Sequence, residues 1–279
     1  MLLLYIVILV GIFGAIGQYI DKHLVNKGIT RKDYFYYMCL SMIPFSIIMV
    51  IIEYLTNQLK FELNIIPFIL LIIAMFLRYK KQHTIVGCLK YLNPYEESAY
   101  LTLGIIIAFV IDVILGIESI HLFSILSILL TVFGVFAIAN SKLKIKNLQQ
   151  DLMIRIIASL LMSYVTHYML QYWSNAVFIL IMNLLLTILF SKGYNFEYHK
   201  NQKNIIKWVF VQQTFGFCAL YMSNYLASNS VTLSSYVRPT SIIVVAIIAM
   251  FFKKKDKKPN IRQIIGILLV VLGICMINK

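Results

Sequence analysis

The chain has 279 residues, of which 61% are hydrophobic and 13% charged, with a formal net charge of +14 and a mean hydropathy of +0.84. A soluble domain carries about 25% charged residues and under half apolar ones, so this composition excludes an ordinary soluble enzyme or binding module. It predicts an integral membrane protein of the cell membrane, in contact with the lipid bilayer and with no nucleic acid as partner.

Apolar stretches near twenty residues long recur along the chain. A helix rising 1.5 Å per residue needs about twenty residues to cross roughly 30 Å of hydrocarbon. The pattern predicts ten transmembrane helices, at 2–20, 34–55, 65–92, 94–116, 121–140, 151–172, 175–191, 205–227, 229–252 and 261–277. The segments between them are short, so the fold class is an all-α polytopic membrane protein with a single membrane domain.

An internal repeat divides the ten spans into two five-helix halves, residues 1–140 and 151–279. LLTVFGVFAIAN near the end of the first half is similar to LLVVLGICMIN near the end of the second, which aligns Gly134 with Gly273. LKYLNPYEESAYLTLG likewise aligns with SNYLASNSVTLSSYVR and pairs Tyr91 with Tyr225. Because each half has an odd number of spans, the halves must enter the membrane in opposite directions, as an inverted repeat.

The distribution of lysine and arginine among the loops predicts the orientation. The loops after the first, fifth, seventh and ninth spans are rich in these residues, whereas those after the second, fourth, sixth and eighth spans carry few. The positive-inside rule makes the basic loops cytoplasmic, so both ends of the chain are expected outside.

The third predicted span contains a cluster of basic and hydrogen-bonding residues, Arg78, Lys80, Lys81, Gln82 and His83. A charge at the bilayer centre costs about 2.5–3.5 kcal/mol or more, so such residues normally face a cavity or a partner. Helical spacing places Arg78, Lys81 and Gln82 on one face, with Lys80 and His83 on a neighbouring face. The cluster predicts a cationic wall that binds a carboxylate or phosphate.

Two alternatives for this cluster remain open. It could form a cytoplasmic or re-entrant loop between two short spans, or its charges could pair internally with Glu96, Glu97 or Asp112. The repeat aligns the cluster with QQTFGF at 212–217, inside the eighth predicted span. That alignment favours one continuous third helix.

Further substrate-binding residues are expected on three other spans. Tyr164, His167 and Gln171 fall on one stripe of the sixth span, where an aromatic wall could stack on a sugar or base. The alternative is an interfacial aromatic belt with one core histidine. The remaining candidates are Gln212 and Gln213 in the eighth span, as neutral ligands, and Arg238 in the ninth span, as a further cation.

The cysteines and histidines give no sign of metal or redox chemistry. Four scattered cysteines include no CxxC pair, and none of the five histidines has HExxH spacing. The cysteines are expected to be buried small hydrophobes, no cofactor is expected, and the chain is not expected to be an enzyme.

The recurring stretches GCLKYLNPYEESAYLTLG, with FGVFAIAN, and MSNYLASNSVTLSSYVRPTS, with LGICMIN, resemble the drug/metabolite transporter superfamily of EamA type. The resemblance covers nearly the whole chain through loose motifs. It implies a transporter with a central cavity between the halves, lined by the early helices of each half and by the third, fourth, eighth and ninth spans. Many relatives carry Leu-Glu-Pro near the start of the ninth span, where this chain has Val237-Arg238-Pro239.

The function expected from the sequence is secondary transport of an anionic or phosphorylated small metabolite by alternating access, as a monomer or homodimer. One alternative is a flippase for a lipid-linked anionic head group of the undecaprenyl-phosphate-sugar type. An intramembrane enzyme or a non-transporting membrane subunit are the others.

Overall fold

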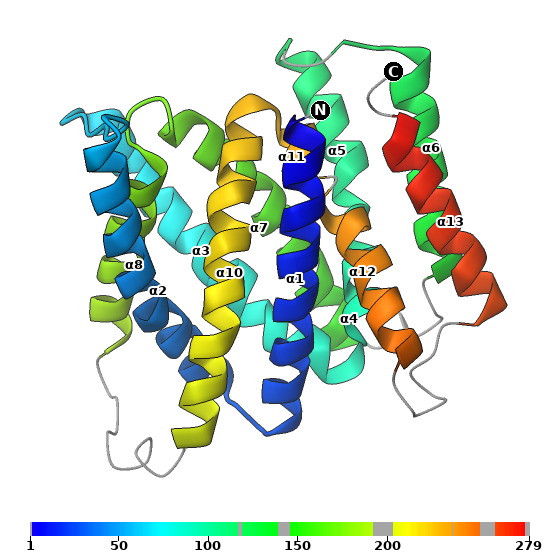
Figure 1. Ribbon diagram of the computed structural model, residues 1–279, viewed down its shortest axis with the longest axis horizontal. Coiled ribbons are helices and arrows are strands. Elements are labelled where there is room, and N and C mark those ends of the chain that lie inside the picture. Colours follow the sequence, from blue (N-terminus) through cyan, green and yellow to red (C-terminus); the bar gives the residue numbers. More distant parts are fainter. Residues whose placement is uncertain are drawn as a thin grey trace.

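The computed structural model describes residues 2–116, 119–138, 146–191, 203–235, 237–251 and 260–276. Within these ranges the regular elements are all helices, which confirms the all-α class, and one isolated bridge joins Phe61 to Trp173. The helices, shown in Figure 1, are α1 (Leu2–Asn26), α2 (Arg31–Leu55), α3 (Ile65–Tyr91), α4 (Pro94–Thr102), α5 (Gly104–Ile114), α6 (Leu122–Ile138), α7 (Lys146–Met169), α8 (Asn175–Phe190), α10 (Lys203–Asn229), α11 (Val231–Ser235), α12 (Val237–Phe251) and α13 (Ile261–Met276).

Five helical stretches in the described part are long and apolar enough to cross a membrane by length and composition. They are Tyr5–Asn26, Arg31–Leu55, Pro94–Ile114, Leu148–Met169 and Lys203–Asn229. Three shorter apolar helices, α6, α8 and α13, stand beside them.

The outer surface is apolar while many polar groups are buried, the reverse of a soluble protein. Ile48 and Ile72 are 55% and 68% exposed, and Phe133 is 63% exposed, whereas Asp112 and Glu97 are fully buried. Side chains of this kind on the outside suit contact with lipid rather than water. The burial pattern therefore agrees with the membrane class that composition predicts.

The third helix is continuous, as the repeat alignment favours. α3 runs without interruption from Ile65 to Tyr91 and contains the whole basic cluster. A loop between two short helices at 78–83 is therefore excluded. The chain breaks only at Leu92 and Asn93, where Asn93 caps α4 and its backbone N–H donates to Glu96 Oε2 over 2.9 Å.

The fourth predicted span, 94–116, corresponds to the single apolar helical stretch Pro94–Ile114, which contains two helices joined at one turn residue. They are α4 and α5, which meet at Leu103, where the backbone N–H donates to Tyr100 O, three residues back, over 3.2 Å. The ninth predicted span consists of α11 and α12.

Several helix ends differ from the predicted limits. α1 continues to Asn26, which places Asp21 and Lys22 inside the helix rather than in a loop. Apolar periodicity marks the extent of the hydrocarbon, whereas a helix can continue as polar turns beyond it. α7 likewise begins at Lys146, before the predicted 151.

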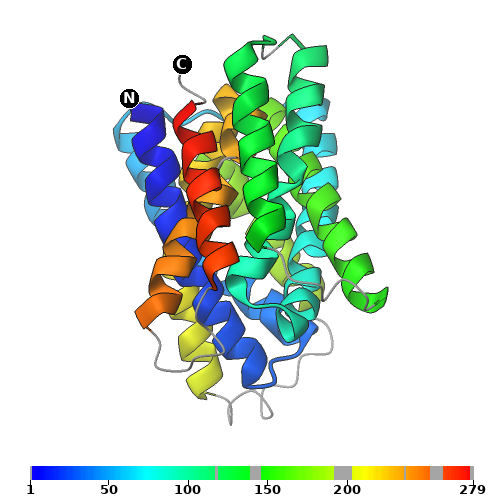
Figure 2. The same cartoon turned by 90° about the vertical axis from the view of Figure 1, so that its right-hand side faces the viewer.

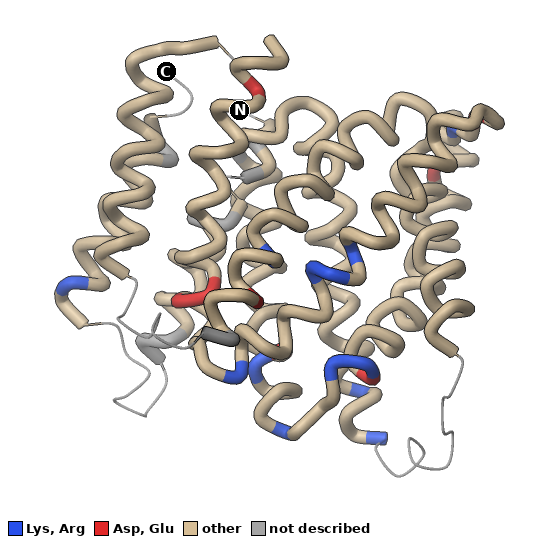
Figure 3. The backbone as a smooth tube through the Cα atoms, turned by 180° about the vertical axis from the view of Figure 1, so that it is seen from behind, with Lys and Arg blue, Asp and Glu red and all other residues tan. Residues whose placement is uncertain are grey.

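The two parts of the chain, 1–140 and 151–279, are intimately packed against each other. α1 packs against α10 and α12, α3 against α7, α2 against α8, and α6 against α13. α1 begins and α13 ends at the same end of the bundle (Figure 1). Lysines and arginines gather toward the opposite end, where α1 meets α2 (Figure 3).

Glycines allow α6 and α13 to approach closely, side by side in Figure 2. A Cβ added at Gly134 would lie 2.5 Å from Gly266 O, and one at Gly273 would lie 2.7 Å from Ser127 O. Ser127 Oγ also donates to Gly273 O over 2.6 Å. Small residues that let two backbones meet are typical of packing between membrane helices.

Candidate functional site

A cavity of about 200 Å³ lies among α1, α2, α3, α4, α5, α7, α10, α11 and α12. Its wall is unusually polar for the interior of an apolar bundle. The polar and charged residues that line it are Gln18, Asp21, Tyr34, Arg78, Lys81, Gln82, Arg155, Ser159, Ser163, Gln212, Gln213, Ser223, Ser234 and Ser241.

Arg78 supplies a buried positive charge from the middle of α3. The residue is only 3% exposed, its Nη2 donates to Met42 Sδ of α2 over 2.8 Å, and its Nε has no hydrogen-bond partner. Arg78 forms no ion pair with a carboxylate within the described ranges. A buried guanidinium that meets a thioether instead of an anion is incompletely satisfied, which favours binding of an anionic group beside it.

Asp21 supplies a carboxylate from α1, and neighbouring helices hold it in place. Tyr34 Oη of α2 donates to Asp21 Oδ1 over 2.8 Å, and Gln212 Nε2 of α10 donates to Oδ2 over 3.3 Å. One turn earlier on α1, Gln18 Oε1 accepts a 2.8 Å hydrogen bond from Ser98 Oγ of α4. These contacts fix the wall of the cavity where α1, α2, α4 and α10 meet.

Arg155 of α7 and Glu97 of α4 form an ion pair at the edge of the cavity. Arg155 Nε lies 3.0 Å from Glu97 Oε1, and the two side chains are 4% and 0% exposed. Glu97 therefore pairs with Arg155 across the edge of the cavity. Among the described residues, no such carboxylate pairs with Arg78.

Five of the eleven residues predicted to bind substrate line the cavity. They are Arg78, Lys81, Gln82, Gln212 and Gln213. The shared face predicted for Arg78, Lys81 and Gln82 is the face that α3 turns to the cavity. Lys80 does not line it: its Nζ lies 5.4 Å from the centroid of the Phe76 ring on the same helix.

The other predicted residues lie elsewhere. His83 contacts Arg31 at the start of α2, Tyr164 Oη donates to Asp112 Oδ1 over 2.7 Å, and His167 Nδ1 donates to Ala227 O over 2.8 Å. α7 ends at Met169, so the exposed Gln171 does not continue the stripe that spacing predicted.

The hydroxyl of Tyr164 bonds to α5 and the imidazole of His167 bonds to α10, so both side chains hold neighbouring helices together. The backbone of Arg238 belongs to α12, but its side chain lies outside the described residues.

Sequence reasoning missed Asp21, Tyr34 and Arg155. Asp21 was assigned to a loop, although Gly14, Gly17, Gln18 and Asp21 follow one helical stripe, i, i+3, i+4, i+7, that could have placed it on the cavity face. Arg155 lies within the sixth predicted span, and the cost of an intramembrane charge applies to it as it does to Arg78.

Comparison with known proteins adds no relative: no protein-family model matches the chain, and no curated protein matches it significantly.

Proposed function

We propose that this chain is a secondary transporter of the cell membrane, with ten spans in two inverted halves, that moves a small anion through the central cavity by alternating access. The observation that carries the proposal is Arg78, a buried cation without a carboxylate partner in the described structure, on the wall of a cavity between the halves. The resemblance to the drug/metabolite transporter superfamily points the same way.

The cavity wall supports the repeat, since equivalent positions of α3 and α10 line it. The alignment that pairs Tyr91 with Tyr225 also pairs Arg78 with Gln212, Gln82 with Gly216 and Ile85 with Ala219. All six of these residues line the cavity.

The first helix of each half shows the same correspondence. On α1 the lining residues Phe13, Gly14, Gly17, Gln18 and Asp21 have the same spacing as Arg155, Ile156, Ser159, Leu160 and Ser163 on α7. Such matched walls are expected when two structural repeats enclose a substrate site.

The glycine contacts of α6 and α13 support a two-fold relation between the halves. The repeat pairs Gly134 with Gly273, and the same register pairs Ser127 with Gly266. If the two halves are exchanged, Gly134 takes the place of Gly273 and Gly266 takes the place of Ser127. The structure contains both the contact between Gly134 and Gly266 and the equivalent contact between Gly273 and Ser127.

The fourth and ninth predicted spans also line the cavity at corresponding places. α4 with α5, and α11 with α12, occupy corresponding places in the two halves. Leu101 and Gly104 from the first pair, and Ser234 and Val237 from the second, line the cavity.

Charge balance favours an anion. Three cations, Arg78, Lys81 and Arg155, and one carboxylate, Asp21, line the cavity, and Glu97 pairs with Arg155. Counted over these five described residues alone, the formal charge is +1, and a low dielectric strengthens the attraction of such a charge for an anion.

Uptake by the purified protein in proteoliposomes tests the proposal. Phosphate esters and carboxylates would be offered as radiolabelled anions, with an amino acid and a nucleoside as neutral comparisons. We expect uptake of an anion that Arg78→Gln abolishes and that Lys80→Gln, a matched loss of charge outside the cavity, leaves intact. Equal uptake by wild type and Arg78→Gln would refute the anion site.

A further inference from the structure

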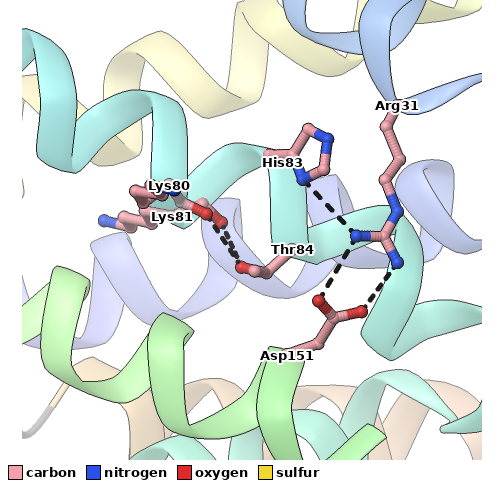
Figure 4. A network of polar contacts seen from close by, with 6 residues as sticks. All are labelled: Arg31, Lys80, Lys81, His83, Thr84 and Asp151. Carbon is pink, nitrogen blue, oxygen red and sulfur yellow. Dashed lines mark hydrogen bonds and ion pairs between the residues drawn. The ribbon is translucent and has the colours of Figure 1, made fainter. Parts of the chain in front are cut away.

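A second polar cluster lies between the halves, just beyond the cavity. Arg31, the first residue of α2, makes two contacts with Asp151 of α7: Nη1 to Oδ1 at 3.3 Å and Nη2 to Oδ2 at 2.8 Å (Figure 4). Nδ1 of His83 on α3 lies 3.4 Å from Arg31 Nη1. Arginine can only donate, so His83 accepts this bond through an unprotonated Nδ1.

The ion pair rests directly on Gly87 of α3. A Cβ added at Gly87 would overlap both Asp151 Oδ2 and Arg31 Nη2. Glycine is thus required for the guanidinium and the carboxylate to cross over α3 in this arrangement. The pair joins α2 to α7 across α3, and α2 and α7 belong to different halves of the proposed repeat.

The pair lies close to the cavity along the chain. Arg31, Gly87 and Asp151 each lie within about one helical turn of a residue that lines it, namely Tyr34, Ile85 and Arg155 respectively. The Arg31 side chain is 38% exposed and that of Asp151 13%, so the pair lies at the boundary between the packed helices and the solvent. This is the basic end of the bundle, which the positive-inside rule makes cytoplasmic.

The opposite end of the interface is held differently. Glu53, near the end of α2, accepts hydrogen bonds from Ser174 Oγ at 2.5 Å, Ala176 N at 3.0 Å and Tyr221 Oη at 2.7 Å. These donors belong to the start of α8 and to α10, in the other half. The two ends of α2 therefore carry separate polar connections between the halves.

We propose that Arg31 and Asp151, seated on Gly87, form a latch that closes the cavity at the basic end and must separate for that end to open. The latch rests on the proposed function in taking the cavity as a transport chamber. An ion pair suits this role because a pair that is partly open to solvent contributes little net stability and can be broken and remade. The adjacent Gly87 lets the halves close without steric conflict.

Accessibility of a cysteine in the cavity tests the latch. In full-length protein whose native cysteines (Cys39, Cys88, Cys218 and Cys275) are replaced, Ser163→Cys would report access of a membrane-impermeant maleimide from the basic end. We expect Arg31→Gln and Asp151→Asn each to raise the labelling rate about threefold to fivefold, the population shift that one partly exposed ion pair permits. Tyr221→Phe, at the opposite end, should not raise it.

Two further variants keep the test decisive if a charge deletion impairs folding. Gly87→Ala displaces the pair without removing a charge and should also accelerate labelling. Joining Arg31→Cys to Asp151→Cys with a short bifunctional thiol reagent should block labelling at Ser163→Cys, and a cleavable reagent should restore it on reduction.

Labelling at the wild-type rate in the single variants and in Gly87→Ala would overturn the latch, as would unimpeded labelling of the cross-linked protein. Labelling needs no substrate, so failure of anion uptake would count against the proposed function and not against the latch.

Discussion

Arg155 Nε lies 3.0 Å from Glu97 Oε1, and both side chains are almost wholly enclosed where α7 meets α4. Glu97→Gln would leave the guanidinium buried without its counter-charge. Removing one partner of a buried pair costs about 3–5 kcal/mol, so we expect a clear fall in the melting temperature in detergent. Lys80→Gln, which removes a charge from a partly exposed side chain, is the control.

Replacing both partners separates charge from packing. The double variant Glu97→Leu with Arg155→Met removes both buried charges and should melt above Glu97→Gln, because desolvation of the isolated arginine is avoided. A melting temperature of Glu97→Gln equal to that of wild type would show that the pair contributes nothing to the fold.

From the close approach of α6 and α13 we predict a second effect on stability. A methyl group at Gly134 would meet the backbone of Gly266 and the side chain of Val270. Backbone cannot move aside as a flexible side chain can, so Gly134→Ala should destabilise the protein by about 1–3 kcal/mol, the usual cost of overpacking. Thermal unfolding in detergent measures it.

Gly104, which lies outside this contact, gives a matched comparison for Gly134. A Cβ there would lie 3.7 Å from Ile156 Cγ2, an ordinary contact distance. Gly104→Ala should therefore cost less than Gly134→Ala. The reverse order of melting temperatures would contradict the close approach of α6 and α13.

From the hydrogen bonds of Glu53, at the end of α2 opposite Arg31, we predict a third effect on stability. Its carboxylate accepts three hydrogen bonds, from Ser174, Ala176 and Tyr221. In Glu53→Gln an amide donor replaces one acceptor oxygen, so at least one buried donor loses its partner at a cost of about 1–3 kcal/mol. Tyr221→Phe removes only one donor, and we expect it to lower the melting temperature less than Glu53→Gln does.

The geometry of the Arg78 guanidinium predicts a graded effect on transport. Arg78→Lys keeps the charge but loses the planar fork that can bind a carboxylate or phosphate through two parallel hydrogen bonds. A lost charge-assisted bond is worth about 1.5–3 kcal/mol, which corresponds to roughly tenfold to a hundredfold in affinity. The KM for anion uptake in proteoliposomes should therefore rise in Arg78→Lys, whereas Arg78→Gln should show no uptake. Identical KM values for wild type and Arg78→Lys would argue that substrate contacts the charge alone.

Much of the helical layout could be predicted because its signals are local. The apolar runs give the class and the approximate positions of most helices, and the repeat favours continuity of α3 through Arg78, as observed. Helical spacing alone places Arg78, Lys81 and Gln82 on one face, and that face lines the cavity.

The sequence by itself determined that this is an all-helical membrane-class chain with cations on one face of its third helix, since composition and helical periodicity depend only on neighbouring residues. Only the tertiary structure decided which charges meet. Glu97 pairs with Arg155, and Arg31 with Asp151, across distances along the chain that no periodicity spans. The packing of α7 against α3 and α4 brings these partners together, and it leaves Arg78 as the buried cation whose partner is expected to be the substrate.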